Sequence, residues 1–395
     1  GMGLNFGSNA LFYQNNQRFL TSSTTAAGNL TIGYQSPTGI DANGGLYNTG
    51  VGYQALGNAT STGYNTAVGY QALKGSATIS NVGYNTAVGY QALLSNTTGS
   101  SNSALGHYAM ESNTIGNRNV GIGTYVLNTN VTKTESTAVG YEAMRYADSA
   151  AGGAVTYNTA LGAYALRGST TAANNTGRYN TALGHSALMS NTAGGSNIAI
   201  GTDAMMFNTT GNQNIAVGHA ALQANTIGNY NVAIGYSALI SNISAYGNAA
   251  IGRDSLSATT VGNENTALGY QTLMSNVGRN GSTAVGYQAM RYADSAAGGA
   301  TTYNTAVGAY ALQGSATAAN NTGTQNTALG HSSMLSNTSG SYNTAVGNGA
   351  LRENTTGGYN LALGTGALLS NTTGANNTAL GYGAGNAGTS NTTGS

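Results

Sequence analysis

A short phrase, Asn-Thr-Ala-Val-Gly-x-x-Ala-Leu, recurs with small variations along almost the whole chain. It occurs in twenty copies, and thirteen of the nineteen steps between them are 17 residues long; the other six are 19, 20 or 22. A fixed period with fixed hydrophobic offsets is typical of one supersecondary unit stacked many times. We therefore expect a quasi-one-dimensional repeat domain over residues 29–385. The copies begin at Asn29, Asn48, Asn65, Asn85, Asn102, Asn119, Ser136, Asn158, Asn180, Asn197, Asn214, Asn231, Asn248, Asn265, Ser282, Asn304, Asn326, Asn343, Asn360 and Asn377.

Each copy reads as β-structure and turns when its positions are counted from the leading Asn as offset 0. Offset 3 is always Val, Ile or Leu, offset 4 is always Gly, and offset 8 is Leu or Met almost everywhere. In the copy that begins at Asn85, Thr-Ala-Val alternates as a strand does, whereas Gly89 and the Asn-Thr-Thr-Gly that follows are turn residues. Two short strands and two turns would make one coil of an all-β, parallel β-solenoid (β-roll) of about 20 coils, with Val88 and Leu93 in its core. Helix is disfavoured because a 17-residue unit rich in Gly, Asn and Thr has poor helix propensity.

Stacking in register predicts columns of equal residues. The Asn residues at offsets 0 and 11 can form hydrogen-bonded amide ladders along the stack. Tyr or His follows the invariant Gly in many copies, at offset 5, which predicts a column of stacked or half-buried rings. Arg118 and Glu135 share offset 16 in consecutive copies, so we expect a surface ion pair that contributes little to stability.

Composition restricts the function. Charged residues are 5% of the chain, against roughly 25% in ordinary soluble domains, and the net charge is only +1. This balance offers no electrostatic basis for binding nucleic acid or an anionic membrane. No apolar run is long enough for a membrane span, so we expect no membrane insertion within this segment. The chain has no cysteine, which is compatible with an extracellular protein whose stability comes from packing.

The two ends depart from the repeat. Residues 1–28 contain three of the four phenylalanines, Phe6, Phe12 and Phe19, and fit the phrase only in degenerate form. We expect this segment to cap the stack. Residues 386–395 follow an unfinished copy and are interpreted as a truncated C-terminal tail, which suggests a segment of a longer fibre.

Nothing in the chain predicts an enzyme or a cofactor. No two of the ten carboxylates share an offset in adjacent copies, so no acid/base pair is implied, and there is no cysteine nucleophile. The four histidines all occupy offset 5 but never in adjacent copies, which makes a metal site a weak candidate beside a structural ring column. They are His107, His185, His219 and His331.

The 22-residue copies are the best candidates for ligand binding. They occupy 136–179 and 282–325, and the two pairs are near-identical over about 60 residues, as in a recent internal duplication. The additional residues are expected to protrude and to present Arg, Tyr and Asp to a host-surface glycan or protein. The alternative is a tolerated turn insertion whose Arg and Asp pair with each other. The candidates are Arg145, Tyr146 and Asp148 in the first pair, and Arg291, Tyr292 and Asp294 in the second.

One coil is too thin to bury much apolar surface, so other chains are expected to share the burial, and a homotrimer is a natural closed solution. The phrase Asn-Thr-Ala-Val-Gly, followed by Ala-Leu, resembles the head repeat of YadA-like trimeric autotransporter adhesins and related repeats of phage and bacterial tail fibres. The resemblance implies a trimer of left-handed parallel β-rolls that binds host surfaces or matrix. The head period of that family is shorter than the 17 residues found here.

These observations lead to a non-enzymatic fibre segment, extracellular, on a cell surface or a virion tail fibre, that serves as shaft or adhesive head. A passive spacer for a tip domain outside this segment is the alternative. An ice-binding solenoid is a third hypothesis, because offset 12 carries a row of Thr that includes Thr97 and Thr114. That row is interrupted by Val131, Ile243 and Val277.

Overall fold

The computed structural model describes residues 11–14, 17–22, 28–35, 46–58, 63–75, 83–147, 155–295 and 299–386. The chain divides into two compact units, residues 1–196 and 197–395, and each is described by itself. Asp148 lies outside the described residues, as do Phe6 and most of the 386–395 tail.

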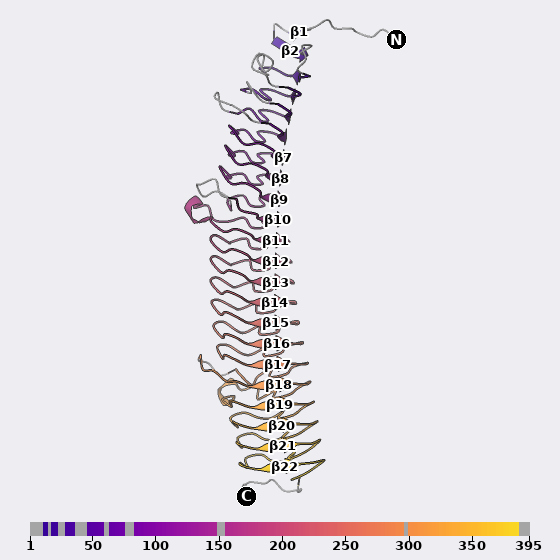
Figure 1. Ribbon diagram of the computed structural model, residues 1–395, viewed down its shortest axis with the longest axis vertical. Coiled ribbons are helices and arrows are strands. Elements are labelled where there is room, and N and C mark those ends of the chain that lie inside the picture. The colour runs from indigo at the N-terminus through magenta and orange to yellow at the C-terminus, as the bar shows by residue number, and fades with distance from the viewer. Residues whose placement is uncertain are drawn as a thin grey trace, which may run out of the picture. The chain divides into compact units, whose positions relative to one another are not determined.

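The first unit is a stack of nine parallel strands preceded by an antiparallel hairpin (Figure 1). Consecutive strands β3 to β11 pair in parallel with equal offsets opposite each other; Ala87, for instance, faces Ala104. The hairpin strands β1 (Leu11–Gln14) and β2 (Gln17–Ser22) pair antiparallel, and β2 then pairs antiparallel with β3. The described part of residues 1–28 is therefore not a parallel coil. The stacked strands are β3 (Leu30–Ile32), β4 (Thr49–Val51), β5 (Thr66–Val68), β6 (Thr86–Val88), β7 (Ser103–Leu105), β8 (Val120–Ile122), β9 (Thr137–Val139), β10 (Thr159–Leu161) and β11 (Thr181–Leu183).

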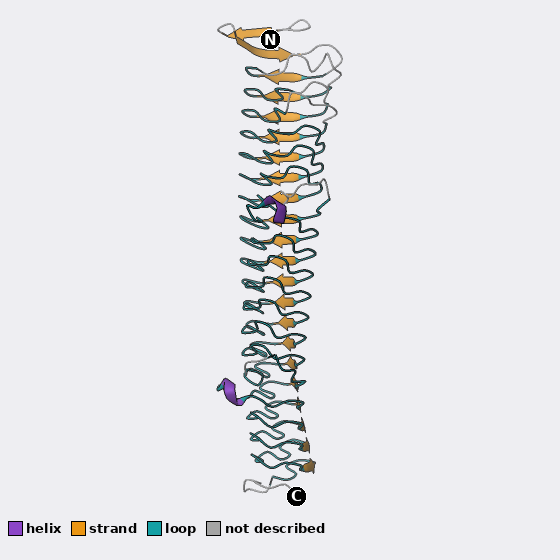
Figure 2. Ribbon diagram, turned by 90° about the vertical axis from the view of Figure 1, so that its left-hand side faces the viewer, coloured by secondary structure: helices purple, strands orange, loops and turns teal. Residues whose placement is uncertain are grey.

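The second unit is a stack of eleven parallel strands in the same register. Single 3-10 turns, η2 (Ala172–Asn174) and η3 (Ala318–Asn320), lie in the long copies, and the described residues contain no α-helix (Figure 2). The predicted all-β parallel solenoid is thus confirmed for both units. The strands are β12 (Ile198–Ile200), β13 (Ile215–Val217), β14 (Val232–Ile234), β15 (Ala249–Ile251), β16 (Thr266–Leu268), β17 (Thr283–Val285), β18 (Thr305–Val307), β19 (Thr327–Leu329), β20 (Thr344–Val346), β21 (Leu361–Leu363) and β22 (Thr378–Leu380).

Each described coil contains one strand, so the prediction of two strands per coil was wrong. The segment after the Gly carries left-handed residues at offsets 6 and 8, such as Gln91 (φ 53°) and Leu93 (φ 51°), and cannot extend. Its backbone is nevertheless paired between coils. The Gln91 N–H donates to the Tyr70 carbonyl at 2.8 Å, and the Leu93 N–H donates to the Ala109 carbonyl at 3.0 Å. The side of the coil opposite the strand is therefore formed by repeated turns that are hydrogen-bonded from coil to coil, rather than by a second sheet.

The core consists of the Ala at offset 2, the Ala at offset 7 and the Leu or Met at offset 8. Ala87, Ala92 and Leu93 are fully buried in this way. The expectation that Val88 lies in the core was wrong, because side chains alternate along a strand and Ala87 takes the inward position. The offset-3 residue faces outward, and Leu105 is 48% exposed.

The invariant Gly at offset 4 is required by the spacing of the coils. Gly89 has φ of 139°, and a Cβ added there would collide with the carbonyl oxygen of Gly106 in the next coil. The same approach recurs at Gly269 against Gly286. No L-residue with a side chain fits this position, which explains its invariance.

The predicted amide ladders are confirmed. At offset 0, the Asn65 Oδ1 accepts the backbone N–H of Asn85 at 2.9 Å and its side-chain N–H at 3.2 Å. At offset 11, the Asn113 Nδ2 donates to the Asn96 Oδ1 at 2.9 Å. These buried amides stabilise the stack because their polar atoms are paired with the coils above and below.

Candidate functional site

The ring column at offset 5 is a stack, as expected. Tyr53, Tyr70 and Tyr90 lie with centroids 5.0 Å apart in near-parallel pairs, and His107 continues the stack 5.1 Å from Tyr90. In the second unit His219 stacks on Tyr236 at 5.1 Å. His185 and His331 contact the rings of Tyr164 and Tyr310 instead. Within the described ranges, no group of three or more His, Asp or Glu side chains is arranged to hold a metal ion.

A second tyrosine column precedes the Asn ladder, and sequence reasoning missed it. Tyr64 and Tyr84 stack at 5.0 Å in the first unit, and Tyr342 and Tyr359 at 4.8 Å in the second. All four have φ near 60° and are exposed. The signal was available, because Tyr occupies the position before the leading Asn in many copies.

The outward side of the strands, which we call the sheet face, is mixed: offset 3 is Val, Ile or Leu in every copy, whereas offset 1 is Thr or Ser in most copies, as at Thr266 beside Leu268. It consists of the side chains at offsets 1 and 3, and Leu268 on it is 45% exposed. A run of exposed aliphatic side chains of this kind marks an interaction surface on a folded protein. Its large exposed members include Leu105, Ile122 and Leu161 in the first unit, and Ile198, Ile200, Ile215, Ile234, Ile251 and Leu268 in the second.

In the first pair of long copies, the candidate Arg145 belongs to a charged cluster. Its Nη1 lies 2.7 Å from Glu142 Oε1, and Arg167 Nε lies 2.8 Å from Glu142 Oε2. The guanidinium of Arg145 also lies over the ring of the candidate Tyr146 at 5.0 Å and over Tyr125 at 4.7 Å. Because Glu142 is almost completely buried, the two arginines compensate a charge that would otherwise be unpaired.

In the second pair of long copies, the Glu and the second Arg of this cluster are replaced by uncharged amides. Gln288 and Gln313 stand where Glu142 and Arg167 stand in the first pair, and the Gln313 Nε2 donates to the Gln288 Oε1 at 3.2 Å. The adjacent Arg and Tyr are retained, and the Arg291 guanidinium lies over the Tyr292 ring at 5.0 Å, as in the first pair. The Arg-Tyr unit is therefore common to both pairs, whereas the Glu-Arg pair was exchanged for two amides.

Asp294 does not lie where a surface ligand could reach it. It is only 1% exposed, and its carboxylate accepts hydrogen bonds from the Ser282 hydroxyl, from Thr302 Oγ1 at 3.2 Å and from Asn304 Nδ2 at 3.0 Å. Burial raises the pKa of this carboxyl group, and the three hydrogen bonds and Arg279 oppose that shift. The expected protruding Asp is thus an interior group at this position. It also forms no ion pair with Arg291 of the kind that the alternative interpretation required, within the described residues.

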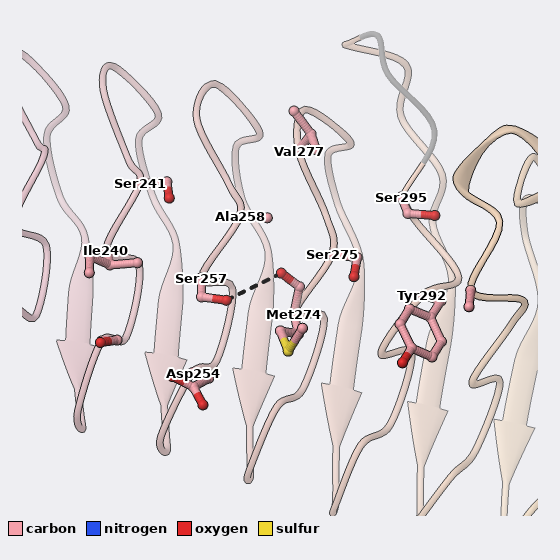
Figure 3. Close-up of a pocket in the computed structure, with 12 residues that line it drawn as sticks. Ile240, Ser241, Asp254, Ser257, Ala258, Met274, Ser275, Val277, Tyr292 and Ser295 are labelled. Carbon is pink, nitrogen blue, oxygen red and sulfur yellow. Dashed lines mark hydrogen bonds between the residues drawn. The ribbon is translucent and has the colours of Figure 1, made fainter.

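A trough runs across several coils of the second unit, and Tyr292 is one of the residues that line it (Figure 3). It is an open groove with a volume of about 620 Å³. Its floor contains Ser241, Ala258 and Ser275, which occupy offset 10 in three consecutive coils. These residues are small, whereas the next coil carries Tyr292 at the same offset.

The lining of the trough comes from several offsets of the repeat. Ser237 and Asp254, both at offset 6, and Val277 and Ala316, both at offset 12, belong to its lining. Ile240 and Met274 add apolar surface at offset 9. None of the lining residues belongs to a strand, so the trough lies on the turn side of the coils, away from the sheet face.

No protein-family model matches this chain, and no curated protein matches it. Among the described residues no helix is long and apolar enough to cross a membrane. The structure places Tyr292 at a concave surface and Asp294 in the interior, and it places Arg145 and Tyr146 in a charged cluster.

Proposed function

We propose that this chain is a non-enzymatic extracellular fibre segment, on a cell surface or a virion tail fibre, that mediates attachment to a host or another surface as a homotrimer. The observation that carries the proposal is the contrast between the two sides of each coil. The strand side is regular and carries an unbroken row of aliphatic side chains at offset 3, whereas the turn side carries the insertions and the trough.

The sheet face supports self-association. In the four 22-residue copies all additional residues follow offset 10, so the spacing of the strand, the Gly and the Ala-Leu pair never changes. A surface that accepts no insertion and exposes aliphatic side chains such as Ile251 and Leu268 is suited to packing against an equal surface. Identical chains arranged about one axis bury such faces together. The resemblance to YadA-like head repeats favours three chains.

The turn side supports attachment. It carries the Arg-Tyr units Arg145–Tyr146 and Arg291–Tyr292, and one of them stands at a trough. Exposed loops on a rigid scaffold commonly carry binding residues. Association through the sheet face leaves this side free to contact a surface.

A binding assay tests the attachment role. The intact chain, labelled at an added C-terminal tag, is incubated with intact cells and with glycan-coated surfaces, and retained label is measured after washing. Saturable retention that unlabelled chain competes away supports the proposal. Retention no greater than that of an unrelated β-solenoid contradicts it and favours the passive spacer.

The spacer remains the second candidate, since the coils from Asn197 to Ser282 repeat at 17 residues without any insertion. Ice binding is disfavoured because the Thr hydroxyl groups that it would need are already hydrogen-bonded within the protein. Thr114 Oγ1 donates to the Val131 carbonyl at 2.9 Å, and Thr226 Oγ1 donates to the Ile243 carbonyl at 3.0 Å. The Thr row is thus engaged in bonds between coils, and it is interrupted at Val131 and Ile243. Thermal hysteresis measurements on the intact chain check this.

A further inference from the structure

We propose that the trough in the second unit binds a neutral saccharide, with the ring of Tyr292 as its stacking platform. The inference rests on the proposed attachment function and names the ligand class of that function. It uses the groove that Tyr292 lines, not the buried carboxylate of Asp294.

The lining suits sugar rings. Hydroxyl groups of Ser241, Ser257 and Ser275 alternate with the apolar side chains of Ile240 and Met274 along the trough (Figure 3). A pyranose presents hydroxyl groups at its edge and C–H groups on its faces, so it needs this mixture of partners. Pockets that hold small ligands commonly enclose about 300–1,000 Å³, and this open groove has a volume of about 620 Å³. Three floor coils at about 4.8 Å spacing give a length of roughly 10 Å, which suits a disaccharide.

Tyr292 is suited to stacking. Its ring lines the trough (Figure 3). The guanidinium of Arg291 lies 5.0 Å from the centroid of this ring. A cation over one face of a ring restrains the ring and leaves its other face for an apolar partner. The C–H face of a sugar is such a partner, and aromatic side chains supply large rigid contact area at low entropy cost.

Charge favours a neutral ligand over an acidic one. Asp254 is the one charged residue that lines the trough, and its Oδ2 already lies 3.4 Å from Arg253 Nε. Among the described lining residues there is no arginine or lysine, and the two nearby arginines, Arg253 and Arg291, already contact Asp254 and Tyr292, so an acidic saccharide would bring its charge beside Asp254 without a cation of its own. A sulfated or carboxylated glycan is therefore disfavoured.

The backbone favours a saccharide over an extended peptide. Peptides that add to a sheet need an edge with unpaired N–H and C=O groups. The trough contains no strand residue, and its floor is paired between coils; the Ser275 N–H, for example, donates to the Arg291 carbonyl at 3.0 Å. A peptide would have to leave its own backbone groups unpaired in the groove.

The experiment combines a glycan array with calorimetry on the intact chain. The probes are neutral disaccharides and oligosaccharides, with sialylated and sulfated forms as comparison. Tyr292→Ala removes the platform, and Ser275→Phe fills the trough. Phe at this offset is compatible with the fold, because Phe207 occupies offset 10 of another coil. The matched controls are Tyr292→Phe, which keeps the ring, and Ser336→Phe, which places the same substitution at offset 10 of a coil outside the trough.

We expect neutral glycans to bind, and both Tyr292→Ala and Ser275→Phe to weaken that binding at least tenfold. Tyr292→Phe and Ser336→Phe should leave affinity within twofold, with unchanged thermal midpoints for all four variants. Binding of acidic glycans alone, or neutral binding that Ser275→Phe leaves intact, overturns the inference. If the chain attaches to cells and the trough variants attach equally well, the saccharide site is wrong and the attachment function stands. If the chain neither attaches to cells nor binds a glycan, both proposals are wrong.

Discussion

The side-chain amide of Asn304 donates a hydrogen bond to the carboxylate of Asp294 at 3.0 Å, beside a position where the Asn ladder is interrupted. Ser282 replaces the leading Asn in that coil, and its hydroxyl donates to the same carboxylate. Asp294, which comes from the long copy, therefore supplies the acceptor that an Asn would have supplied. Ser136 interrupts the ladder in the same way in the first unit.

A pH dependence of stability follows from Asp294. Burial raises its pKa in the folded protein above the unfolded value of about 3.9. The folded state therefore binds the proton more tightly than the unfolded state, and this group favours folding most at low pH. The stabilisation that Asp294 contributes is lost as pH rises from the pKa of this group in the unfolded state through its pKa in the folded state. Asp294→Asn should remove this dependence; its Oδ1 can still accept from Asn304 Nδ2, while the hydroxyl groups of Ser282 and Thr302 must turn to accept from its amide nitrogen.

The measurement is the difference in thermal midpoint between the wild type and Asp294→Asn across that pH range. Subtraction of the two midpoints cancels every pH-dependent contribution that both proteins share. We expect the variant to gain on the wild type as pH rises. A difference in thermal midpoint that is constant with pH contradicts a raised pKa of Asp294 in the folded protein.

The two long pairs predict an energetic coupling between Glu142 and Arg167. Glu142→Gln alone leaves Arg145 and Arg167 without their carboxylate and should cost about 2–4 kcal/mol. Glu142→Gln with Arg167→Gln reproduces the arrangement of Gln288 and Gln313 and should cost less than the single substitution. Denaturation of the single and double variants gives the coupling. A double variant that costs the sum of both singles would contradict this interpretation.

The glycine column predicts a sharp contrast between two Gly→Ala substitutions. Gly269 has φ of 137°, and a Cβ there meets the backbone of Gly286, so Gly269→Ala should destabilise the second unit by about 3 kcal/mol or more. Gly299 has nothing within 4 Å of an added Cβ. Gly299→Ala should change stability by less than about 0.5 kcal/mol. Urea denaturation of both variants decides; equal effects would show that coil spacing does not require glycine.

The sheet face predicts a contrast between two exposed apolar residues. Leu268 lies on the strand and Val261 on the turn side, and both are exposed by nearly half. Leu268→Glu introduces a charge that would be buried between chains, so it should dissociate the assembly. Val261→Glu should leave the assembly intact. Sedimentation velocity of both variants at one concentration makes the comparison, and dissociation by both or neither argues against the sheet face as the interface.

The period of the sequence was enough to predict the stack, the two Asn ladders and the ring column. These features follow from register alone, because equal offsets lie above one another once the coils are parallel. The ion pair between Arg118 and Glu135, 2.6 Å apart, was predicted on the same basis and is present. The Gly at offset 4 was predicted only as a turn residue, and the structure adds the reason for its invariance, the close backbone approach of Gly89 and Gly106.

Other features depend on tertiary context. Gln91 and Leu93 adopt left-handed conformations that cost about 1–2 kcal/mol per residue for L-amino acids, so no local propensity predicts them. They are compensated by the bonds between coils and the burial of Leu93. The side chain of Val88 points outward because its neighbour Ala87 points into the core, and the sequence alone does not say which of the two points inward. The burial of Asp294 could not be predicted, because it depends on the path by which the inserted residues lead back to the Asn ladder at offset 0.

The mass of the intact chain in solution tests the central claim most directly, because the sheet face is proposed to be buried between identical chains. Light scattering coupled to size-exclusion chromatography, at micromolar concentration and neutral pH, gives that mass independently of the shape of the particle. The account predicts three times the 39.4 kDa of one chain. A stable, well-folded species at 39.4 kDa would contradict it.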